Sequence, residues 1–196
     1  MIAQSKIDFE LEYWLTADRA GHERRYRAIL DMWGLTEADS ILEIGTGPFS
    51  GVLPYVKARR KVGVDPLYRT YQEFGLFRAD KGIEYAGVEF EGGATFTREL
   101  GPLHAIVTMN ALDHGGSDFH AVERVGSMLE KGGRFYLHVH LRTSEQLNVG
   151  HDHCLTLEAL HEALALANLR TVWEQDLDRD PIEFCEYRTV IGVYEK

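Results

Sequence analysis

The chain has 196 residues, of which 44% are hydrophobic, which suits one domain with a full core, residues 1–196. Acidic residues outnumber basic ones by 31 to 21, so the formal net charge is −10. This charge disfavours nucleic acid or an anionic membrane as a partner, because phosphate binding needs a positive surface. Two cysteines, no apolar run of bilayer length and no basic-then-apolar leader predict a soluble cytoplasmic protein without a disulfide framework.

The pattern of apolar residues predicts alternating helices and strands along the chain. The expected helices lie at residues 18–33, 50–60, 67–78, from Ser117 to Leu129 and from Thr156 onward. The expected strands lie at residues 41–45, 61–65, within 83–91, 104–110 and 134–140, with two more in the tail. This alternation favours an α/β fold with a doubly wound parallel sheet, to which the tail adds an edge.

The stretch ILEIGTGPFSG, residues 41–51, is a strand that turns sharply through three glycines. In an open α/β sheet such a turn lies at the carboxyl edge, where ligands bind. Gly45 and Gly47 would let the backbone approach a ligand, and the amides of the following helix would face the same place. Asp65 ends the next expected strand, where a carboxylate can accept both hydroxyls of a ribose. A nucleoside-containing cofactor is therefore expected, with a structural glycine turn as the alternative.

Two details distinguish between nucleoside cofactors. The dinucleotide fingerprint needs its third glycine at Ser50, whereas this chain has Gly51. A carboxylate at Glu43 would repel a pyrophosphate but suits a ligand with an amino group and a positive sulfonium. A nicotinamide-dependent oxidoreductase and a non-catalytic cofactor-binding protein stay open as alternatives.

These residues resemble class I S-adenosylmethionine-dependent methyltransferases. ILEIGTGPFSG resembles the family's first motif, VGVDPLY its second, HAIVTMNALDH its fourth-strand motif and MLEKGGRFYLHVH its fifth-strand motif. The resemblance spans nearly the whole chain and implies a mostly parallel seven-stranded sheet with an antiparallel C-terminal strand and helices on both faces. It also implies a helical lid segment over residues 1–35, a core over 36–196, and O- or N-methylation of a small or medium-sized acceptor.

The resemblance implies that S-adenosyl-L-methionine is the cofactor. The positions that match its motifs are Glu43, Gly45, Thr46, Gly47, Asp65, Pro66, Leu67, Gly93, Ala94 and Asn110. Gly93 stands where most relatives have an aspartate that reaches the adenine amino group. That contact is therefore absent here, or is supplied by Glu91 or the backbone.

His114 is the first candidate for a catalytic base, and His140 is the second. His114 follows Asn110 by four residues, and an imidazole that titrates near neutral pH can take a proton from a hydroxyl or an amine. A helix-capping role for His114 is the alternative.

Further side chains are expected to contact the acceptor. They are Tyr13 and Trp14 in the lid segment, and His151 and His153 in the loop NVGHDHC. The spacing of His138 and His140 could also suit a metal, but pocket or core roles are favoured and no metal is predicted. No N-P-P-Y-type motif and no Pro-Cys pair occurs, so a small molecule is favoured over nucleic acid as the acceptor.

Overall fold

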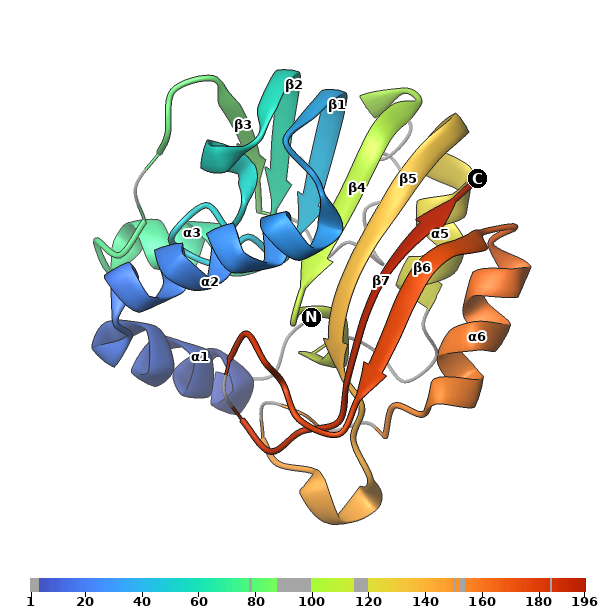
Figure 1. Ribbon diagram of the computed structural model, residues 1–196. Helices are drawn as coiled ribbons and strands as arrows, with labels where there is room; N and C mark the ends of the chain where they lie inside the picture. The colour runs from blue at the N-terminus through green and yellow to red at the C-terminus, as the bar shows by residue number, and fades with distance from the viewer. Residues whose placement is uncertain are drawn as a thin grey trace.

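The computed structural model describes residues 4–77, 79–87, 100–114, 120–149, 151, 154–183 and 185–196. These residues form a seven-stranded sheet with the strand order β3-β2-β1-β4-β5-β7-β6 (Figure 1). Its strands are β1 Glu37–Ile44, β2 Lys57–Val64, β3 Ile83–Ala86, β4 Leu103–Met109, β5 Leu129–His140, β6 Arg170–Leu177 and β7 Thr189–Glu195. Strands β1 to β5 pair in parallel, and β7 is antiparallel to both β5 and β6. The expected fold class is confirmed.

Helices cover both faces of the sheet. The α-helices are α1 Gln4–Thr16, α2 Arg19–Trp33, α3 Tyr68–Glu73, α5 His120–Met128 and α6 Leu157–Leu166. Short 3-10 turns lie at η1 Leu53–Tyr55, η2 Leu112–His114 and η3 Ser144–Gln146. Figure 1 shows α2 across one face, while α5 and α6 lie on the other side of β5 and β6.

The alternation of side chains along β5 shows why both faces need cover. Phe135, Leu137 and Val139 belong to the hydrophobic core that includes residues of α5 and α6. Tyr136 points to the opposite side and belongs to the core that includes α2. Successive side chains on a strand point to opposite faces, so a strand covered on both faces is apolar almost throughout.

The helix expected at 50–60 does not form. The chain makes the short turn η1 and is already in strand β2 from Lys57 onward. Ser50 and Gly51 have positive φ values of 66° and 54°, which interrupt a right-handed helix before it can start. The sequence prediction was wrong here, because in this described stretch only the 3-10 turn η1 follows the glycine turn before β2 begins.

Other element boundaries shift by smaller amounts. Helix α2 matches the expectation and ends at Gly34, whose φ of 64° is a left-handed cap. Strand β5 begins at Leu129, several residues before the expected start, and Gly132 within it has a φ of 81°. Thr156 caps α6 as expected by accepting a hydrogen bond from the Ala159 amide. The expected cap at Ser117 lies outside the described residues.

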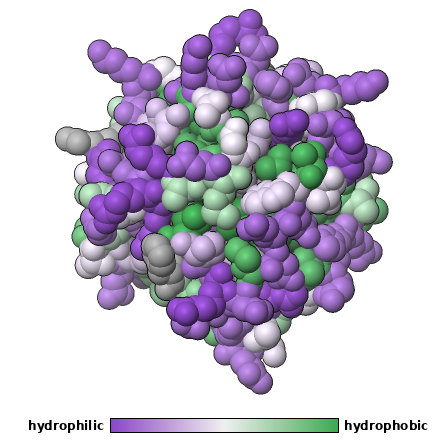
Figure 2. Space-filling model, viewed as in Figure 1, coloured by the Kyte–Doolittle hydropathy of each residue, from purple (hydrophilic) through white to green (hydrophobic). Residues whose placement is uncertain are grey.

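The surface agrees with the composition. The face that carries α1 and α2 is mostly hydrophilic, with hydrophobic residues in small patches near its centre (Figure 2). None of the helices in the described part of the chain combines the length and the apolar character of a membrane span.

Candidate functional site

The candidate site lies at the carboxyl edge of the sheet, where β1 is adjacent to both β2 and β4. The strand order reverses at this point, and open α/β sheets bind their ligands there. Residues 45–47 follow β1, Asp65 follows β2 and Asn110 follows β4. The structure therefore brings these parts of the predicted cofactor site to one edge.

Asp65 joins the first two of these segments. Its Oδ2 accepts a hydrogen bond of 2.9 Å from the Gly47 amide, and its Oδ1 accepts one of 2.8 Å from the Leu67 amide. Burial raises the pKa of this carboxyl to about 6, although the two amide hydrogen bonds act in the opposite direction. Each carboxylate oxygen can accept a second hydrogen bond, so Asp65 retains the capacity to bind hydroxyl groups.

Glu43 lies beneath the turn and not above it. Its side chain is buried, and its carboxylate accepts hydrogen bonds from the amides of Val52, at 2.9 and 3.1 Å, and Leu53, at 3.3 Å. Burial raises the pKa of this carboxyl to about 8. This placement differs from the expected contact with the amino group of a ligand, since the carboxylate instead holds the backbone of the turn.

The same contact explains the third glycine of the motif. A Cβ atom at Gly51 would overlap the Glu43 carboxylate. The residue also has a φ of 54°, which disfavours any side chain. The acid in the strand and the glycine eight positions later are thus one structural unit.

Protein atoms lie against Gly45 and Gly47. A Cβ atom at Gly45 would overlap the side chain of Ala111, which follows β4. At Gly47 a Cβ atom would come within 2.9 Å of Cζ2 of Trp14, a residue of α1. Helix α1 therefore covers the turn with its indole, and the predicted pocket residue Trp14 lies directly on the predicted cofactor loop.

The residues at this edge fit a polar ligand. Oγ1 of Thr46 and Oδ1 of Asn110 are buried and lack a hydrogen-bond partner within the described ranges. Buried polar atoms are nearly always paired, so two such atoms at one edge indicate a missing polar group. Asn110 also has a φ of 50°, a conformation that asparagine tolerates well.

The remaining predicted cofactor residues differ in placement. Pro66 is exposed and Leu67 is buried, where Leu67 packs with Leu11 and Tyr71. Gly93 and Ala94, at the adenine end of the predicted site, lie outside the described residues.

His114 contacts an acid that the sequence reasoning missed. Its Nδ1 lies 3.0 Å from Oε1 of Glu10, a residue of α1. Burial would raise the pKa of the Glu10 carboxyl, but the contact with His114 outweighs it and the pKa is lowered. The ring of His151 lies 4.1 Å from that of His114, and Oε2 of Glu10 accepts a 3.2 Å hydrogen bond from Trp14. One acid thus connects the lid segment to the predicted base.

Tyr13 lies at the junction of α1 and α2. Its hydroxyl is 3.1 Å from Nε2 of His22, and its ring packs edge-on against Trp14 with centroids 5.0 Å apart. Tyr13 is 44% exposed, so part of the ring faces solvent. His153 lies outside the described residues.

His140 belongs to a different set of contacts from His114. Its Nε2 is 2.6 Å from Oδ2 of Asp180, and Nε2 of His138 is 2.9 Å from the same oxygen. Burial would raise the pKa of Asp180, but the two histidines hold it well below its usual range. The structure does not unite the two predicted bases, and His140 is only 2% exposed.

Nothing in the sequence singled out Glu10 or Asp180. Glu10 lies between two other acids, Asp8 and Glu12, in a segment where the aromatic residues Tyr13 and Trp14 carry the prediction. Asp180 precedes a proline in DRDP, which reads as a turn signal. The partners of both acids are far away along the chain, so no local pattern could reveal the pairs.

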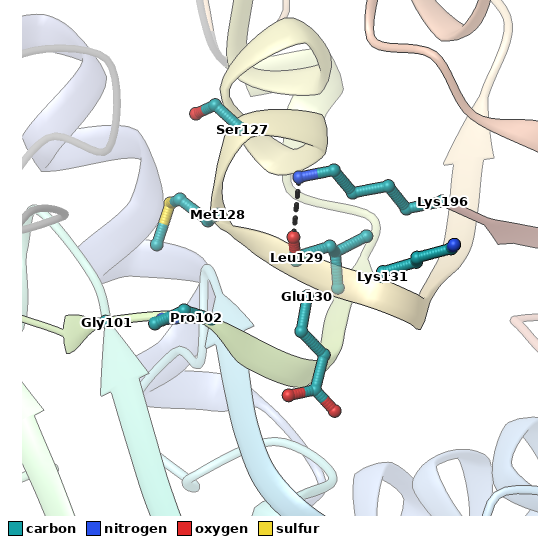
Figure 3. Close-up of a pocket in the computed structure, with 8 residues that line it drawn as sticks. All are labelled: Gly101, Pro102, Ser127, Met128, Leu129, Glu130, Lys131 and Lys196. Carbon is teal, nitrogen blue, oxygen red and sulfur yellow. Dashed lines mark hydrogen bonds between the residues drawn. The ribbon is translucent and has the colours of Figure 1, made fainter.

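A surface pocket of about 500 Å³ lies at the amino ends of β4 and β5 (Figure 3). It is lined by Gly101, Pro102, Ser127, Met128, Leu129, Glu130, Lys131 and Lys196. The Lys196 ammonium donates a 2.6 Å hydrogen bond to the Leu129 carbonyl at this edge. None of the predicted site residues lines this pocket, which lies at the opposite edge from Asp65 and Asn110.

Comparison with known proteins tests the fold. No protein-family model and no curated protein matches the chain. Among solved structures, a protein from Haloferax volcanii in complex with the Trm112 methyltransferase activator is 15% identical, with a TM-score of 0.68. The match covers 100% of this chain and 98% of that one.

Two similar structures were solved with S-adenosylhomocysteine. The N-methyltransferase NodS from Bradyrhizobium japonicum is 16% identical, with 99% of both chains covered and a TM-score of 0.61. The 1,6-didemethyltoxoflavin-N1-methyltransferase from Burkholderia thailandensis is 16% identical, with a TM-score of 0.63. The match covers 97% of this chain and 86% of that one. The chain therefore has the Rossmann-like fold of the class I S-adenosylmethionine-dependent methyltransferases.

Proposed function

We propose that this protein is an S-adenosylmethionine-dependent methyltransferase that acts on a small or medium-sized acceptor by O- or N-methylation. The arrangement at the carboxyl edge carries the proposal. There the Asp65 carboxylate, at the end of β2, meets the Gly47 amide of the glycine turn beside Asn110. Neighbours with this fold and with bound S-adenosylhomocysteine support the choice of cofactor.

Each residue at this edge has a role in holding the cofactor. Asp65 would accept hydrogen bonds from the two ribose hydroxyls through the remaining lone pairs of its carboxylate. Asn110 Oδ1 and Thr46 Oγ1, which are buried without partners among the described residues, would hold the polar methionine end. The bound cofactor supplies a methyl group on a positive sulfonium. Glu43 acts from below, by holding the turn through Val52 and Leu53.

Helix α1 acts as a lid over this site. Trp14 lies against Gly47, so a ligand that packs on the Cα side of Gly47 needs the indole to move. The helix buries only Leu11, which packs with Leu67, Tyr71 and neighbouring apolar side chains; we call this set the lid cluster. An attachment of this size is weak enough to open and close.

Closure of the lid also orients the proposed catalytic base, His114, through Glu10. Glu10 on α1 lies 3.0 Å from Nδ1 of His114, and an acceptor there favours the tautomer with the proton on Nδ1. Nε2 is then the basic nitrogen and takes the proton of the acceptor's hydroxyl or amine as the methyl arrives. Closure of α1 therefore excludes water and positions the base in one movement.

A dinucleotide cofactor is disfavoured by the turn itself. Pyrophosphates bind at the N-terminus of a helix that follows the glycine-rich turn. Here the chain forms only the short η1, and the amides of Val52 and Leu53 already bond to Glu43. The oxidoreductase alternative therefore lacks its phosphate site.

Calorimetry tests the cofactor. S-adenosylmethionine and S-adenosylhomocysteine should bind, whereas NAD and NADP should show no measurable binding. Asp65→Ala should weaken S-adenosylhomocysteine binding about ten- to hundred-fold, because hydrogen bonds to a charged group contribute about 1.5–3 kcal/mol. Asp39→Ala is the matched control, because Asp39 is an exposed acid of the neighbouring strand β1. Tight NADP binding with none for S-adenosylhomocysteine contradicts the proposal.

Turnover with a methyl donor against panels of small alcohols, phenols and amines tests the reaction. Methylation of any member supports the enzyme. Cofactor binding without methylation of a broad panel would instead favour a non-catalytic binding protein.

A further inference from the structure

A cluster of metal-ligating side chains includes none of the predicted cofactor residues, although its neighbour His138 accepts a 2.8 Å hydrogen bond from the Asn110 amide through its carbonyl. It consists of His140, at the end of β5, with Asp180, Glu183 and Cys185 from the connection between β6 and β7. One nitrogen, two carboxylate oxygens and one sulfur all lie within 4.8 Å of one another. His140 and Asp180 are buried, and the other two are partly buried.

We propose that His140, Asp180, Glu183 and Cys185 bind one zinc ion in a four-coordinate site. Zinc in structural sites takes four nitrogen, sulfur or oxygen ligands at about 2.0–2.3 Å in a tetrahedron, which places donor atoms roughly 3.3–3.7 Å apart. Nε2 of His140 lies 3.6 Å from Sγ of Cys185, which is already such a spacing. The 2.6 Å distance between Nε2 of His140 and Oδ2 of Asp180 would lengthen by roughly 1 Å when the ion enters between the two atoms.

The donor types select the metal. Thiolate and imidazole together favour zinc over magnesium or calcium, which prefer oxygen ligands only. Two carboxylates within 4.8 Å of each other place two negative charges at close range, and the Cys185 sulfur would add a third on binding the ion as a thiolate. A divalent cation offsets this repulsion, which is costly where the groups are shielded from water.

The surrounding backbone holds the ligands in place. Oδ1 of Asp180 accepts hydrogen bonds from the amides of Ile182, at 2.6 Å, and Glu183, at 2.9 Å. The Asp180 amide bonds to the Cys185 carbonyl at 3.1 Å, so the segment is closed on itself and two ligands are brought together. His138 Nε2 lies 2.9 Å from Oδ2 of Asp180 and acts as an outer partner of a ligating carboxylate.

The ion would fasten the connection between β6 and β7 to strand β5. This connection extends from the sheet toward α1 (Figure 1), so the zinc would fix one wall beside the lid. In the competing arrangement there is no ion, and the hydrogen bonds of Asp180 with His138 and His140 tie the segment to β5.

Metal analysis distinguishes the two arrangements. Protein purified without an affinity tag of histidines and without chelator should contain about one zinc per chain by plasma mass spectrometry. Protein stripped with a chelator should rebind one equivalent of Zn²⁺ by calorimetry and melt at a higher temperature than the stripped form. Absence of zinc from the purified protein together with no stoichiometric rebinding overturns the proposal.

Cobalt substitution tests the ligands in the folded wild-type chain. Co²⁺ in the stripped protein should produce a thiolate-to-cobalt charge-transfer band, which Cys185→Ser should abolish. Cys154→Ser is the matched control, because Cys154 is the other free cysteine and is exposed. A band that is absent in the wild type, or that survives in Cys185→Ser, contradicts the site.

A pair of glutamate variants tests the same site without relying on the cysteine. Glu183→Gln should weaken Zn²⁺ binding at least about tenfold, while Glu186→Gln, an exposed acid three residues later, should leave it unchanged. Circular dichroism of each variant verifies that it is folded. Equal Zn²⁺ affinity in the two variants would exclude Glu183 as a ligand and with it the four-coordinate site.

Discussion

Glu43 and Gly51 depend on each other at the level of single atoms. The buried carboxylate needs the space that a side chain at residue 51 would take, and the turn needs the carboxylate as acceptor for two amides. Neither residue is explained by its own strand or turn propensity. Their relation is visible only where the turn folds back over the strand.

Gly51→Ala should therefore destabilise the protein more than an ordinary glycine replacement. We expect a loss of about 2 kcal/mol or more, since the Cβ overlaps the Glu43 carboxylate in addition to the backbone strain. Gly75→Ala is the control, because Gly75 has a similar φ of 67° with nothing within 4 Å of the added atom. Denaturant unfolding of both variants measures the difference. Equal losses of unfolding free energy in the two variants would mean that the overlap with Glu43 does not affect stability.

His114 is the residue on which the proposed chemistry depends most. His114→Ala should lower turnover about 10²–10⁴-fold while S-adenosylhomocysteine affinity changes little, because the base acts on the acceptor and not on the cofactor. Single-turnover rates and calorimetry on the same variant separate the two effects. His161→Ala provides the control, as His161 is an exposed histidine of α6 that contacts Glu174. Intact turnover with lower thermal stability would identify His114 as structural.

At the scale of elements, α1 is less firmly attached to the rest of the chain than α2. It contributes Glu10 and Trp14 to the site, yet Leu11 is its one buried residue among those described. Helix α2, in contrast, buries five side chains, His22, Tyr26, Ile29, Leu30 and Trp33. The difference in burial fits one element that moves over another that stays in place.

Leu11→Ala should open the lid. Removing the buried side chain weakens the lid cluster, in which a Leu→Ala change at a buried site costs about 2–5 kcal/mol. We expect faster association of S-adenosylhomocysteine, because Trp14 leaves Gly47 more often, and lower turnover, because Glu10 leaves His114. Stopped-flow fluorescence and steady-state assays measure these rates. Leu15→Ala, on the same helix but 58% exposed, should change neither, and an effect of equal size there would argue against a lid.

At the scale of the whole molecule, the buried acids link stability to pH. The pKa of Glu43 is about 8 in the folded chain, above its ordinary value near 4.5. Between these two pH values the folded state binds a proton that the unfolded chain has released. The contribution of Glu43 to the free energy of unfolding is therefore full below pH 4.5 and is lost as the pH rises through 8. Asp65 acts in the same direction, and its contribution to the free energy of unfolding is lost as the pH rises through about 6. His22, whose pKa burial lowers to about 4, acts oppositely, but only below pH 6.5.

The free energy of unfolding of the wild type should accordingly fall by about 1–2 kcal/mol between pH 6.5 and 8 because of Glu43. In Glu43→Gln this decline should be smaller, since the amide does not titrate. Urea titrations at several pH values measure both curves. Parallel curves would assign the decline to another group.

The periodicity of the sequence was sufficient for most strands and for α2. Apolar runs at 104–110 and 134–140 predicted β4 and β5, because a central parallel strand is buried on both faces and needs no alternation. It failed at 50–60. There the spacing of apolar residues imitates a helix, whereas the Glu43 carboxylate and two residues with positive φ impose a tight turn.

The sequence by itself determined the order of strands along the chain, the glycine turn and the acid at the end of β2, because these depend on local pattern and motif. Only the tertiary structure decided which side chains meet. Glu10 with His114, and Asp180 with His140, are contacts between elements far apart in the chain. Such contacts follow from how helices and loops pack on the sheet, and no local periodicity records that packing.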